Sequence, residues 1–306
     1  MIGGLVEIAE EGRHLSLFRG FLKVSMDGSE IGRVPLDDIH TLLISAHGTS
    51  ISTNLMTELA ERKAMVVTLG RNWHPKTITL PLNAHYQGAG ILQDQIALSV
   101  PRAKRLWQQV VVDKIGNQAK ILRWHNGDVI KVRELEILMG RVRSGDPDNM
   151  EAQAARHYWP GLMGSDFRRD TAGGDINGYL NYGYAILRAA TARAVVSAGL
   201  TPALGIHHKN KYNSFALVDD LMEPYRPLVD NLVRQMSDRG DTLSSLGPEE
   251  KRALAAVLQY DLPGQKGMSP LVNCLHTLAQ SFVTCLTDKT KKLTFAPLPD
   301  RQELFQ

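Results

Sequence analysis

The fold of the first 80 residues is decided by one stretch, HLSLFRGFLKVSMDG at residues 14–28. Apolar and polar side chains alternate over residues 14–18, which is typical of a half-buried strand. A second apolar run, residues 21–26, ends at Asp27-Gly28, and this pair favours a hairpin because both positions tolerate positive φ. Working outward, we expect further strands at residues 5–8, 32–36, 39–44 and 65–69. Leu55, Met56 and Leu59 recur at helical spacing and predict a helix over residues 52–63, with Ser52 or Thr53 as its N-cap.

The rest of the chain favours helices. Residues 83–93 contain two glycines and no basic side chain, which is typical of a linker. Pro101 is well placed to open a helix, and Asp146-Pro147 predicts another, with Asp146 as N-cap and an end near Trp159. Further helices are expected over residues 177–198 and after residues 248 and 269. The predicted fold class is α+β, a small N-terminal β-rich domain (1–82), a linker (83–100) and a larger all-α catalytic domain (101–306).

Length and composition exclude several classes of protein. The chain has 306 residues, of which 43% are hydrophobic and 22% charged, and these proportions exclude a disordered, collagenous or coiled-coil chain. No apolar run approaches the ~20 residues of a membrane span, and no signal peptide is visible, so we expect a cytoplasmic protein without a membrane partner. Cys274 and Cys285 would lie roughly 16 Å apart on one helix, too far for a disulfide, and are expected to be buried thiols.

Positive charge is concentrated in one segment. The net charge is +3, but residues 101–143 carry ten Lys or Arg against four acids, a net +6, and the remainder sums to −3. One interpretation is a solvated helix face with ion pairs. The other is a track for a polyanion, and its candidate DNA-binding residues are Arg102, Lys104, Arg105, Lys114, Lys120, Arg123, Arg141 and Arg143. Trp107 and Trp124 lie among these charges and could stack on bases, although tryptophan at helical spacing is more typical of a core.

The window 205–227 combines histidines and acids. His207 and His208 precede a probable helix that carries Asp219, Asp220 and Glu223 within about one turn, where either aspartate could lie beside Glu223. Carboxylates that share a face repel one another, so a divalent cation is a natural neutraliser. Imidazole with carboxylate suits manganese and oxygen ligands suit magnesium, whereas the lack of cysteine argues against structural zinc.

Two ordinary interpretations stand beside this one. The acids could serve only as partners of the helix dipole at a helix start. Glu151 lies in a predicted helix among small residues, which would let a ligand approach, but alone it would be interpreted as an exposed helix glutamate.

Four motifs carry a resemblance to a known family. They are EEGRHLSL at residues 10–17, GRVPLDDI at 32–39, NYGYAIL at 181–187 and DLMEP at 220–224. Together they resemble the CRISPR-associated integrase family, the first of the two universal proteins of spacer acquisition. The resemblance covers nearly the whole chain and is closest to type II forms, with subtype II-C as the expectation.

The resemblance implies a site and an activity. Glu151, His208 and Glu223 match the residues that hold a divalent metal, Mg²⁺ or Mn²⁺, with Asp220 and His207 as supporting residues; a shift of one position would exchange the two histidines. The implied enzyme is a metal-dependent DNA endonuclease and integrase. It inserts DNA fragments (spacers) into a CRISPR array through attack of a 3′-hydroxyl on a phosphodiester of the repeat.

The implied partners are double-stranded DNA, a second copy of the chain paired through the β domains, a small ferredoxin-like second universal CRISPR-associated protein, and the type II effector nuclease. Two other functions stay open, namely a metal-dependent phosphodiesterase acting on other or branched nucleic acids and a non-catalytic DNA-binding scaffold. The tail after Lys292 is expected to be mobile or bound to a partner.

Overall fold

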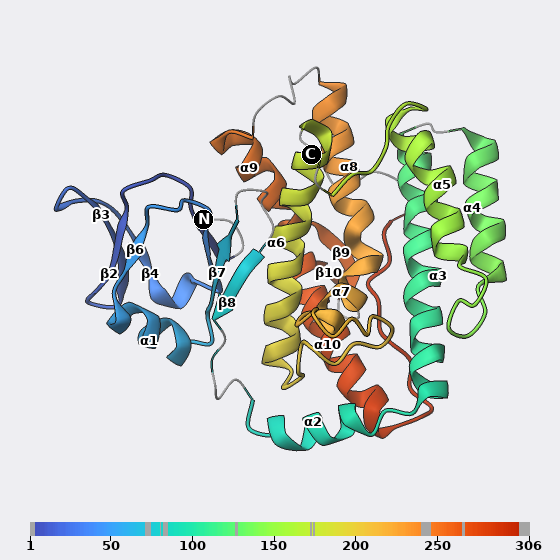
Figure 1. The fold of residues 1–306 in the computed structure, drawn as a ribbon, viewed down its shortest axis with the longest axis horizontal. Coiled ribbons are helices and arrows are strands. Elements are labelled where there is room, and N and C mark those ends of the chain that lie inside the picture. Colours follow the sequence, from blue (N-terminus) through green and yellow to red (C-terminus); the bar gives the residue numbers. More distant parts are fainter. Residues whose placement is uncertain are drawn as a thin grey trace.

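The computed structural model describes residues 4–70, 75–79, 81, 85–125, 128–171, 173, 175–239, 246–264 and 267–299. It has an N-terminal β region followed by a mostly helical region, as the predicted α+β class requires (Figure 1). The predicted boundary between residues 82 and 83 falls outside the described residues.

The N-terminal region contains two four-stranded sheets. The first has the order β1-β5-β7-β8, in which β1, β5 and β7 are parallel and β8 is antiparallel to β7. The second has the order β4-β3-β2-β6, and its β3–β4 hairpin turns at Asp27-Gly28 with positive φ at both residues, as predicted. The strands are β1 Leu5–Ile8, β2 His14–Phe18, β3 Phe21–Met26, β4 Ser29–Pro35, β5 Thr41–Ile44, β6 Ser50–Ile51, β7 Met65–Leu69 and β8 Pro75–Thr79. A short 3₁₀ turn, η1 Leu36–Asp38, separates β4 from β5.

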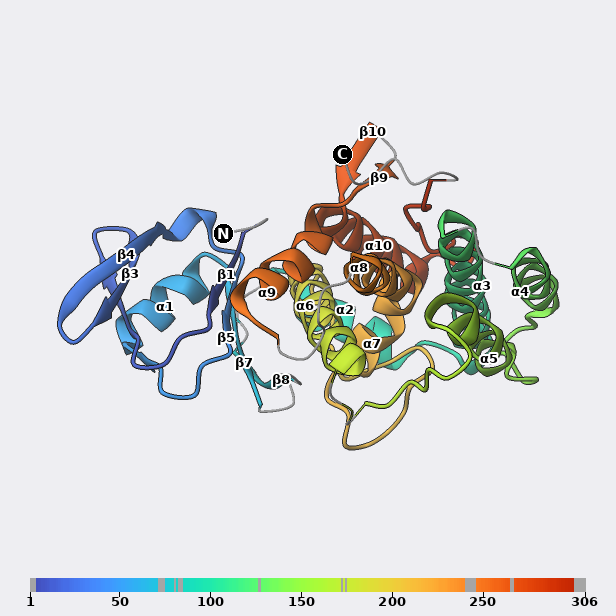
Figure 2. The same ribbon diagram turned by 90° about the horizontal axis from the view of Figure 1, so that it is seen from above.

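The first sheet is covered on both faces. Leu42 and Val66 pack into an N-terminal core with helix α1, Thr53–Glu61, whose N-cap is Ser52 as predicted. Leu43 and Val67 point the other way and belong to the large core of the helical region. Successive residues of a strand face opposite sides, which explains why all four residues of β5 are buried. The first sheet therefore lies between the N-terminal core and the helical region (Figure 2).

Helix α6 is buried along most of its length, because it lies between the N-terminal sheet and the helices α7, α8, α9 and α10 that pack against it (Figure 1). The helices are α2 Gly88–Ile96, α3 Val100–Trp124, α4 Val129–Arg141, α5 Met150–Met163, α6 Asp175–Ser197, α7 Ala216–Met222, α8 Arg226–Asp238, α9 Pro248–Ala255 and α10 Leu271–Thr287, with 3₁₀ turns η2 Glu223–Tyr225 and η3 Ala256–Gln259. Cys274 and Cys285 are free, buried thiols on α10, as predicted.

Three details differ from the expectations. The segment predicted as a linker contains α2, because Ile91 is buried and anchors one face of that helix. The region predicted as all-α also holds a hairpin, β9 Asp261–Gly264 and β10 Gly267–Pro270. The tail after Lys292 is packed as far as residue 299, since Leu293, Ala296 and Leu298 are buried in the main core.

Helix α5 also begins and ends later than predicted. Its N-cap is Asn149, whose side chain accepts from the backbone N–H of Ala152, while Asp146 forms a turn before the helix and accepts from two further N–H groups. Pro160 lies in the last turn, where it removes only one helical hydrogen bond. The helix therefore continues to Met163.

Candidate active site

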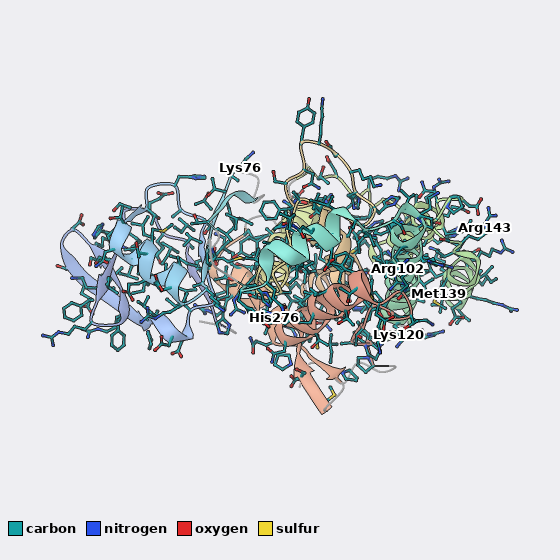
Figure 3. All side chains as sticks on the ribbon, turned by 90° about the horizontal axis from the view of Figure 1, so that it is seen from below. Lys76, Arg102, Lys120, Met139, Arg143 and His276 are labelled. Carbon is teal, nitrogen blue, oxygen red and sulfur yellow. The ribbon has the colours of Figure 1, made fainter. Side chains whose placement is uncertain are left out.

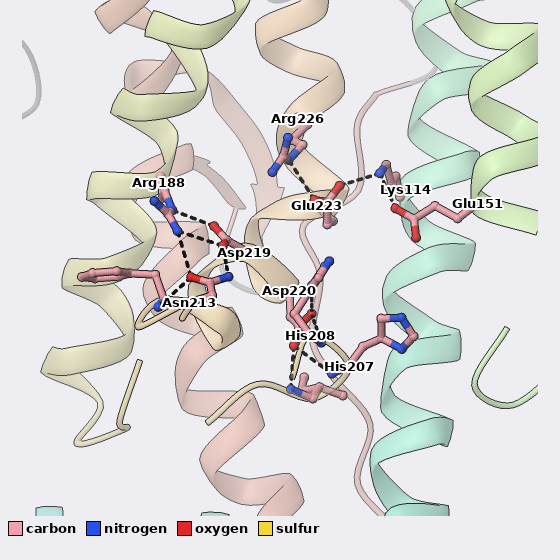
Figure 4. A network of polar contacts seen from close by, with 12 residues as sticks. Lys114, Glu151, Arg188, His207, His208, Asn213, Asp219, Asp220, Glu223 and Arg226 are labelled. Carbon is pink, nitrogen blue, oxygen red and sulfur yellow. Dashed lines mark hydrogen bonds and ion pairs between the residues drawn. The ribbon is translucent and has the colours of Figure 1, made fainter. Parts of the chain in front are cut away.

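The site lies where α3, α5 and the α7–η2 segment meet (Figure 4). Glu151 is in the first turn of α5, where the positive end of the helix dipole favours an acid. Glu223 begins η2, directly after α7. This turn is fastened to α3 because the side-chain amide of Asn117 donates a 2.8 Å hydrogen bond to the carbonyl of Pro224.

Lys114 of α3 joins the two glutamates. Its Nζ lies 2.6 Å from Glu151 Oε1 and 2.5 Å from Glu223 Oε2. The other oxygen of Glu223, Oε1, forms an ion pair with Arg226 Nε at 2.9 Å. Two carboxylates from elements far apart in the sequence are thus held face to face by one ammonium group.

The basic side chains decide the protonation of these acids. Burial alone would raise the pKa of Glu223, but Arg226 and Lys114 outweigh it and the pKa lies below its usual value. Burial likewise works against the charged form of Lys114, while Glu223 and Glu151 raise its pKa above the usual value. Glu223 and Lys114 consequently both stay in their charged forms.

His208 is positioned by a buried aspartate. Its Nδ1 lies 2.6 Å from Oδ1 of Asp220, which is fully buried on α7. Asp220 also accepts from the backbone N–H groups of Ile206, His207 and His208. A side chain at Gly205 would collide with the His208 carbonyl at 2.5 Å, so glycine is required there for the loop to fold onto Asp220.

This arrangement defines the histidine chemically. A carboxylate can only accept, so Nδ1 donates its proton to Asp220; in the neutral imidazole Nε2 then carries the lone pair, the usual state of a metal-ligating histidine. The hydrogen bond to Asp220 raises the pKa of His208. Asp220 therefore supports His208 rather than lying beside Glu223.

His207 plays a different part. Its ring stacks on the buried Trp107 of α3 with 4.3 Å between ring centroids and 6° between planes. Trp107 is 1% exposed, so it is a core residue and not a base-stacking platform. Of the two histidines, only His208 has its ring nitrogen held by an acid among the contacts found in the described part of the chain.

The three acids of the 205–227 window do not form a carboxylate cluster. The carboxylate of Asp219 accepts hydrogen bonds from the guanidinium of Arg188 on α6, at 2.6 and 2.8 Å, and from the side-chain amide of Asn213. Asp220 binds the loop that carries the two histidines, and Glu223 points toward α3. Among the contacts of the described residues Glu223 is paired with neither aspartate, and its partners are the basic side chains of Lys114 and Arg226. Helical spacing predicts which side chains share a face of one helix, but it does not show the basic side chains that neighbouring helices contribute, here Arg188 of α6 and Lys114 of α3.

The carboxylates of Glu151 and Glu223 and the imidazole of His208 are groups that bind divalent cations, although in this structure both carboxylates contact Lys114. Two carboxylates converge on one positively charged group, and His208 lies near enough for the charge of Glu223 to raise its pKa. Within the residues described, however, no three His, Cys, Asp or Glu side chains assemble as a ligand group. A metal at this position would therefore have to take the place of the lysine ammonium.

The candidate DNA-binding residues are divided between surface and interior. Arg102 is 6% exposed and donates to the carbonyls of Cys285, Asp288 and Lys291, so it organises the turn after α10 instead of facing solvent. Lys114 lies in the carboxylate cluster, and Lys120 donates to the Leu298 carbonyl. Figure 3 shows Arg143 at the outer edge of the helical region and Arg102 and Lys120 further in.

The remaining candidates are exposed, namely Lys104, Arg105, Arg123, Arg141 and Arg143. Arg123 pairs with Glu136, and Arg143 pairs with Asp148. Beside Arg105, a surface hollow is lined by further basic residues that the sequence analysis did not select, Lys289, Lys291 and Lys292. Their signal was present as the run DKTKK at residues 288–292.

Arg226 and Arg188 were also missed. Arg226 follows Glu223 by three positions, a spacing that brings side chains together on a helix. Arg188 is 31 residues from Asp219 in the chain, so only the packing of α6 against α7 could reveal their contact.

In the described ranges, no helix combines the length and apolarity needed to cross a bilayer.

Comparison with known proteins supplies the family. Residues 6–246 match the family model described as CRISPR associated protein Cas1. The CRISPR-associated endonuclease Cas1 of Neisseria meningitidis serogroup C is 36% identical over 285 residues, covering 93% of each chain.

Two solved structures share the fold. A chain of a Cas6-RT-Cas1–Cas2 complex has a TM-score of 0.77 at 20% identity, covering 96% of this chain and 36% of that longer one. A casposase bound to integration product has a TM-score of 0.73 at 20% identity, covering 99% and 94%. By the extent of the family match and by its identity to the Neisseria protein, the chain belongs to the Cas1 family.

Proposed function

We propose that this protein is a metal-dependent DNA endonuclease and integrase that inserts DNA fragments into a CRISPR array. The observation that carries the proposal is the pair Glu151 and Glu223, brought face to face beside a histidine that a buried acid orients. The relative named as an endonuclease and the casposase bound to an integration product support the same class of chemistry.

Glu151, His208 and Glu223 would hold Mg²⁺ or Mn²⁺. When bound, such a cation supplies polarisation of the scissile phosphodiester and stabilisation of charge on the entering and leaving oxygens. The reaction itself is an in-line transesterification: the 3′-oxygen of the incoming DNA forms a bond to phosphorus, and the bond to the leaving 3′-oxygen of the repeat breaks.

The chain's own residues prepare this site. Asp220 fixes the ring of His208 and keeps the Nδ1 proton in place. Asp219 and Arg188 tie α7 to α6, and Asn117 ties η2 to α3, so the segment that carries Asp220 and Glu223 is held between two long helices. Preorganisation of this kind removes the cost of arranging ligands during the reaction.

The proposed DNA surface differs from the predicted one. Arg102 and Lys114 are withdrawn from it because both are committed to contacts inside the protein. Lys120 is left out as well, because it donates to the Leu298 carbonyl. The surface comprises the exposed candidates of the 101–143 segment and the lysines of the hollow at 289–292, namely Lys104, Arg105, Arg123, Arg141, Arg143, Lys289, Lys291 and Lys292. We expect log affinity for duplex DNA to fall with log salt at a slope of roughly −4 to −6; a slope near zero would reject this surface.

The assembly is proposed from the family. The partners are a second copy of this chain, Cas2 as the small second protein, the type II effector nuclease and double-stranded DNA, and the site of action is the cytoplasm. A solved structure named as a Cas1–Cas2 complex supports the Cas2 partner.

The deciding experiment is integration into a plasmid that carries CRISPR repeats. The wild type, supplied with Cas2 and labelled DNA fragments, should join the label to the plasmid. His208→Ala should lose joining by at least roughly 100-fold while it still binds DNA, and His207→Ala, the matched neighbour, should lose less. Retained joining in folded His208→Ala would contradict the assigned site.

The same assay separates the other functions. A phosphodiesterase acting on other nucleic acids would cleave branched substrates without joining. A scaffold would neither cleave nor join, and in it the Lys114 ion pairs would serve stability alone. We favour the integrase because Asp220 holds the ring of His208 through Nδ1, so that Nε2 is the nitrogen that could bind a metal, an arrangement that helix stability does not require.

A further inference from the structure

Lys114 occupies the space between the proposed ligands. Its ammonium group contacts one oxygen of each glutamate, and only 15% of its side chain is exposed. Figure 4 shows it reaching from α3 to both acids. Since Arg226 holds the second oxygen of Glu223, that buried carboxylate has a basic partner on each side.

The charges of this cluster are already balanced. Glu151 and Glu223 contribute two negative charges, and Lys114 and Arg226 contribute two positive ones. A divalent cation placed between the glutamates would add two charges to a neutral set, and at separations of a few ångström in a poorly solvated site it would repel the ammonium strongly. A divalent cation and the Lys114 ammonium therefore compete for the same two carboxylates.

The group that can yield is Lys114. Arg226 is held against the ring of Tyr184, with 4.8 Å from its guanidinium carbon to the ring centroid. The backbone of α3 is fixed by the Asn117–Pro224 hydrogen bond, one turn beyond Lys114. The side chain of Lys114 has four rotatable carbon–carbon bonds, so its ammonium group can move away while Arg226 and the backbone of α3 stay in place.

We propose that Lys114 is the built-in counter-ion of the Glu151–Glu223 pair, which holds the carboxylates together in the metal-free protein and competes with the divalent cation for them. This inference rests on the proposed function, because it assumes that the pair binds metal. It assigns Lys114 as a positioning residue that sets the affinity for the cation, in place of its predicted role in DNA binding.

The test measures Mn²⁺ binding by calorimetry on the purified full chain. Lys114→Met removes the competing charge and keeps the length of the apolar stem, so its Kd for Mn²⁺ should be lower than that of the wild type by roughly tenfold or more. Lys104→Met, on the exposed side of the same helix, should leave the Kd unchanged. Without metal, Lys114→Met should melt at a lower temperature than the wild type, and saturating Mn²⁺ should raise its Tm more than that of the wild type.

Glu223→Gln tests the metal site separately from the counter-ion role of Lys114. Loss of Mn²⁺ binding in this variant shows that the measured heat reports on the site. If wild type and Lys114→Met bind Mn²⁺ equally well, or the variant binds more weakly, the counter-ion role is wrong and the metal site stands. If no form binds Mn²⁺, both proposals fail.

A measurement on the wild type covers the case in which Lys114→Met does not fold. Acetylation of lysines followed by mass spectrometry should label Lys114 slowly in the presence of EDTA and faster with saturating Mn²⁺, because the displaced ammonium becomes accessible. Lys104 serves as the internal control and should be labelled equally in both conditions. Unchanged labelling of Lys114 would overturn the inference.

Discussion

Glu223 and Asp230 are two buried carboxylates on one continuous helical stretch, seven residues apart, and their surroundings have opposite effects. Glu223 meets Lys114 and Arg226, and its pKa is lowered despite burial. Asp230 is 2% exposed and accepts from the hydroxyls of Tyr158 and Tyr184; burial raises its pKa to about 6. Direct cationic partners keep a buried acid charged, whereas phenols compensate only part of the cost of burial.

The difference indicates two roles. An acid that stays ionised and faces a second carboxylate is suited to bind a cation. An acid enclosed by two tyrosines links α5, α6 and α8 and serves the packing of the helical region.

The largest expected effect is on catalysis. Glu223→Ala should reduce strand transfer by at least roughly 1000-fold, because it removes a proposed metal ligand. Asp230→Asn should keep most of the activity. Initial rates in the plasmid integration assay measure both, with circular dichroism as the check on folding. Similar losses in the two variants would erase the distinction between the two carboxylates.

The next effect concerns the stability of the metal-free protein. Arg226→Met should lower the free energy of unfolding by roughly 3–5 kcal/mol, since it deprives a buried carboxylate of one partner. Urea unfolding in EDTA provides the measurement, and Arg234→Met is the control because the Arg234 ion pair with Asp238 is more exposed. A loss no larger than that of the control would mean that Lys114 alone suffices for Glu223.

A third prediction uses pH. The folded state holds the Asp230 proton up to about pH 6, whereas the unfolded chain releases it near 3.8. The contribution of Asp230 to stability should therefore fall as pH rises from about 4 to about 6, by at most about 3 kcal/mol at ~1.4 kcal/mol per pKa unit, and stay level above that. Glu223 should act in the opposite sense, because its lowered pKa contributes stability that is lost as pH falls below 4.5.

Difference curves isolate these terms. The unfolding free energy of the wild type minus that of Asp230→Asn should slope downward with pH between 4 and 6. The corresponding curve for Glu223→Gln should slope upward with pH below about 4.5 and stay level above it. Slopes of the same sign in the two difference curves would contradict the environments assigned to Asp230 and Glu223.

The smallest expected effect comes from a single phenol. Tyr158→Phe should cost about 1–2 kcal/mol, because it removes one hydrogen bond to a buried acid, and should raise the pKa of Asp230 further. Tyr86→Phe is the matched control, since Tyr86 is 90% exposed. A change in Tm equal to that of the control would show that this hydrogen bond contributes nothing measurable.

Much of the fold could be predicted because its signals are local. Alternation over residues 14–18, the Asp27-Gly28 turn and the Ser52 cap act within a few residues of themselves, and the structure has each of them. The start of α5 was misplaced because two side chains, Asp146 and Asn149, both cap, and their spacing alone does not say which one begins the helix. The burial of Leu293, Ala296 and Leu298 was missed because the tail packs through contacts with α3 and α10.

By itself, the sequence determined the α+β class, most of the N-terminal strands and several of the later helices, the free thiols and, through its motifs, the family and the residues to inspect. Only the tertiary structure decided which charges meet. It paired Lys114 with Glu151 and Glu223, residues 37 and 109 positions away, and it turned Asp219, Asp220 and Glu223 toward three different partners. Secondary structure follows from short-range sterics and periodicity, whereas the state of a buried charge depends on whichever side chain packing brings within a few ångström of it.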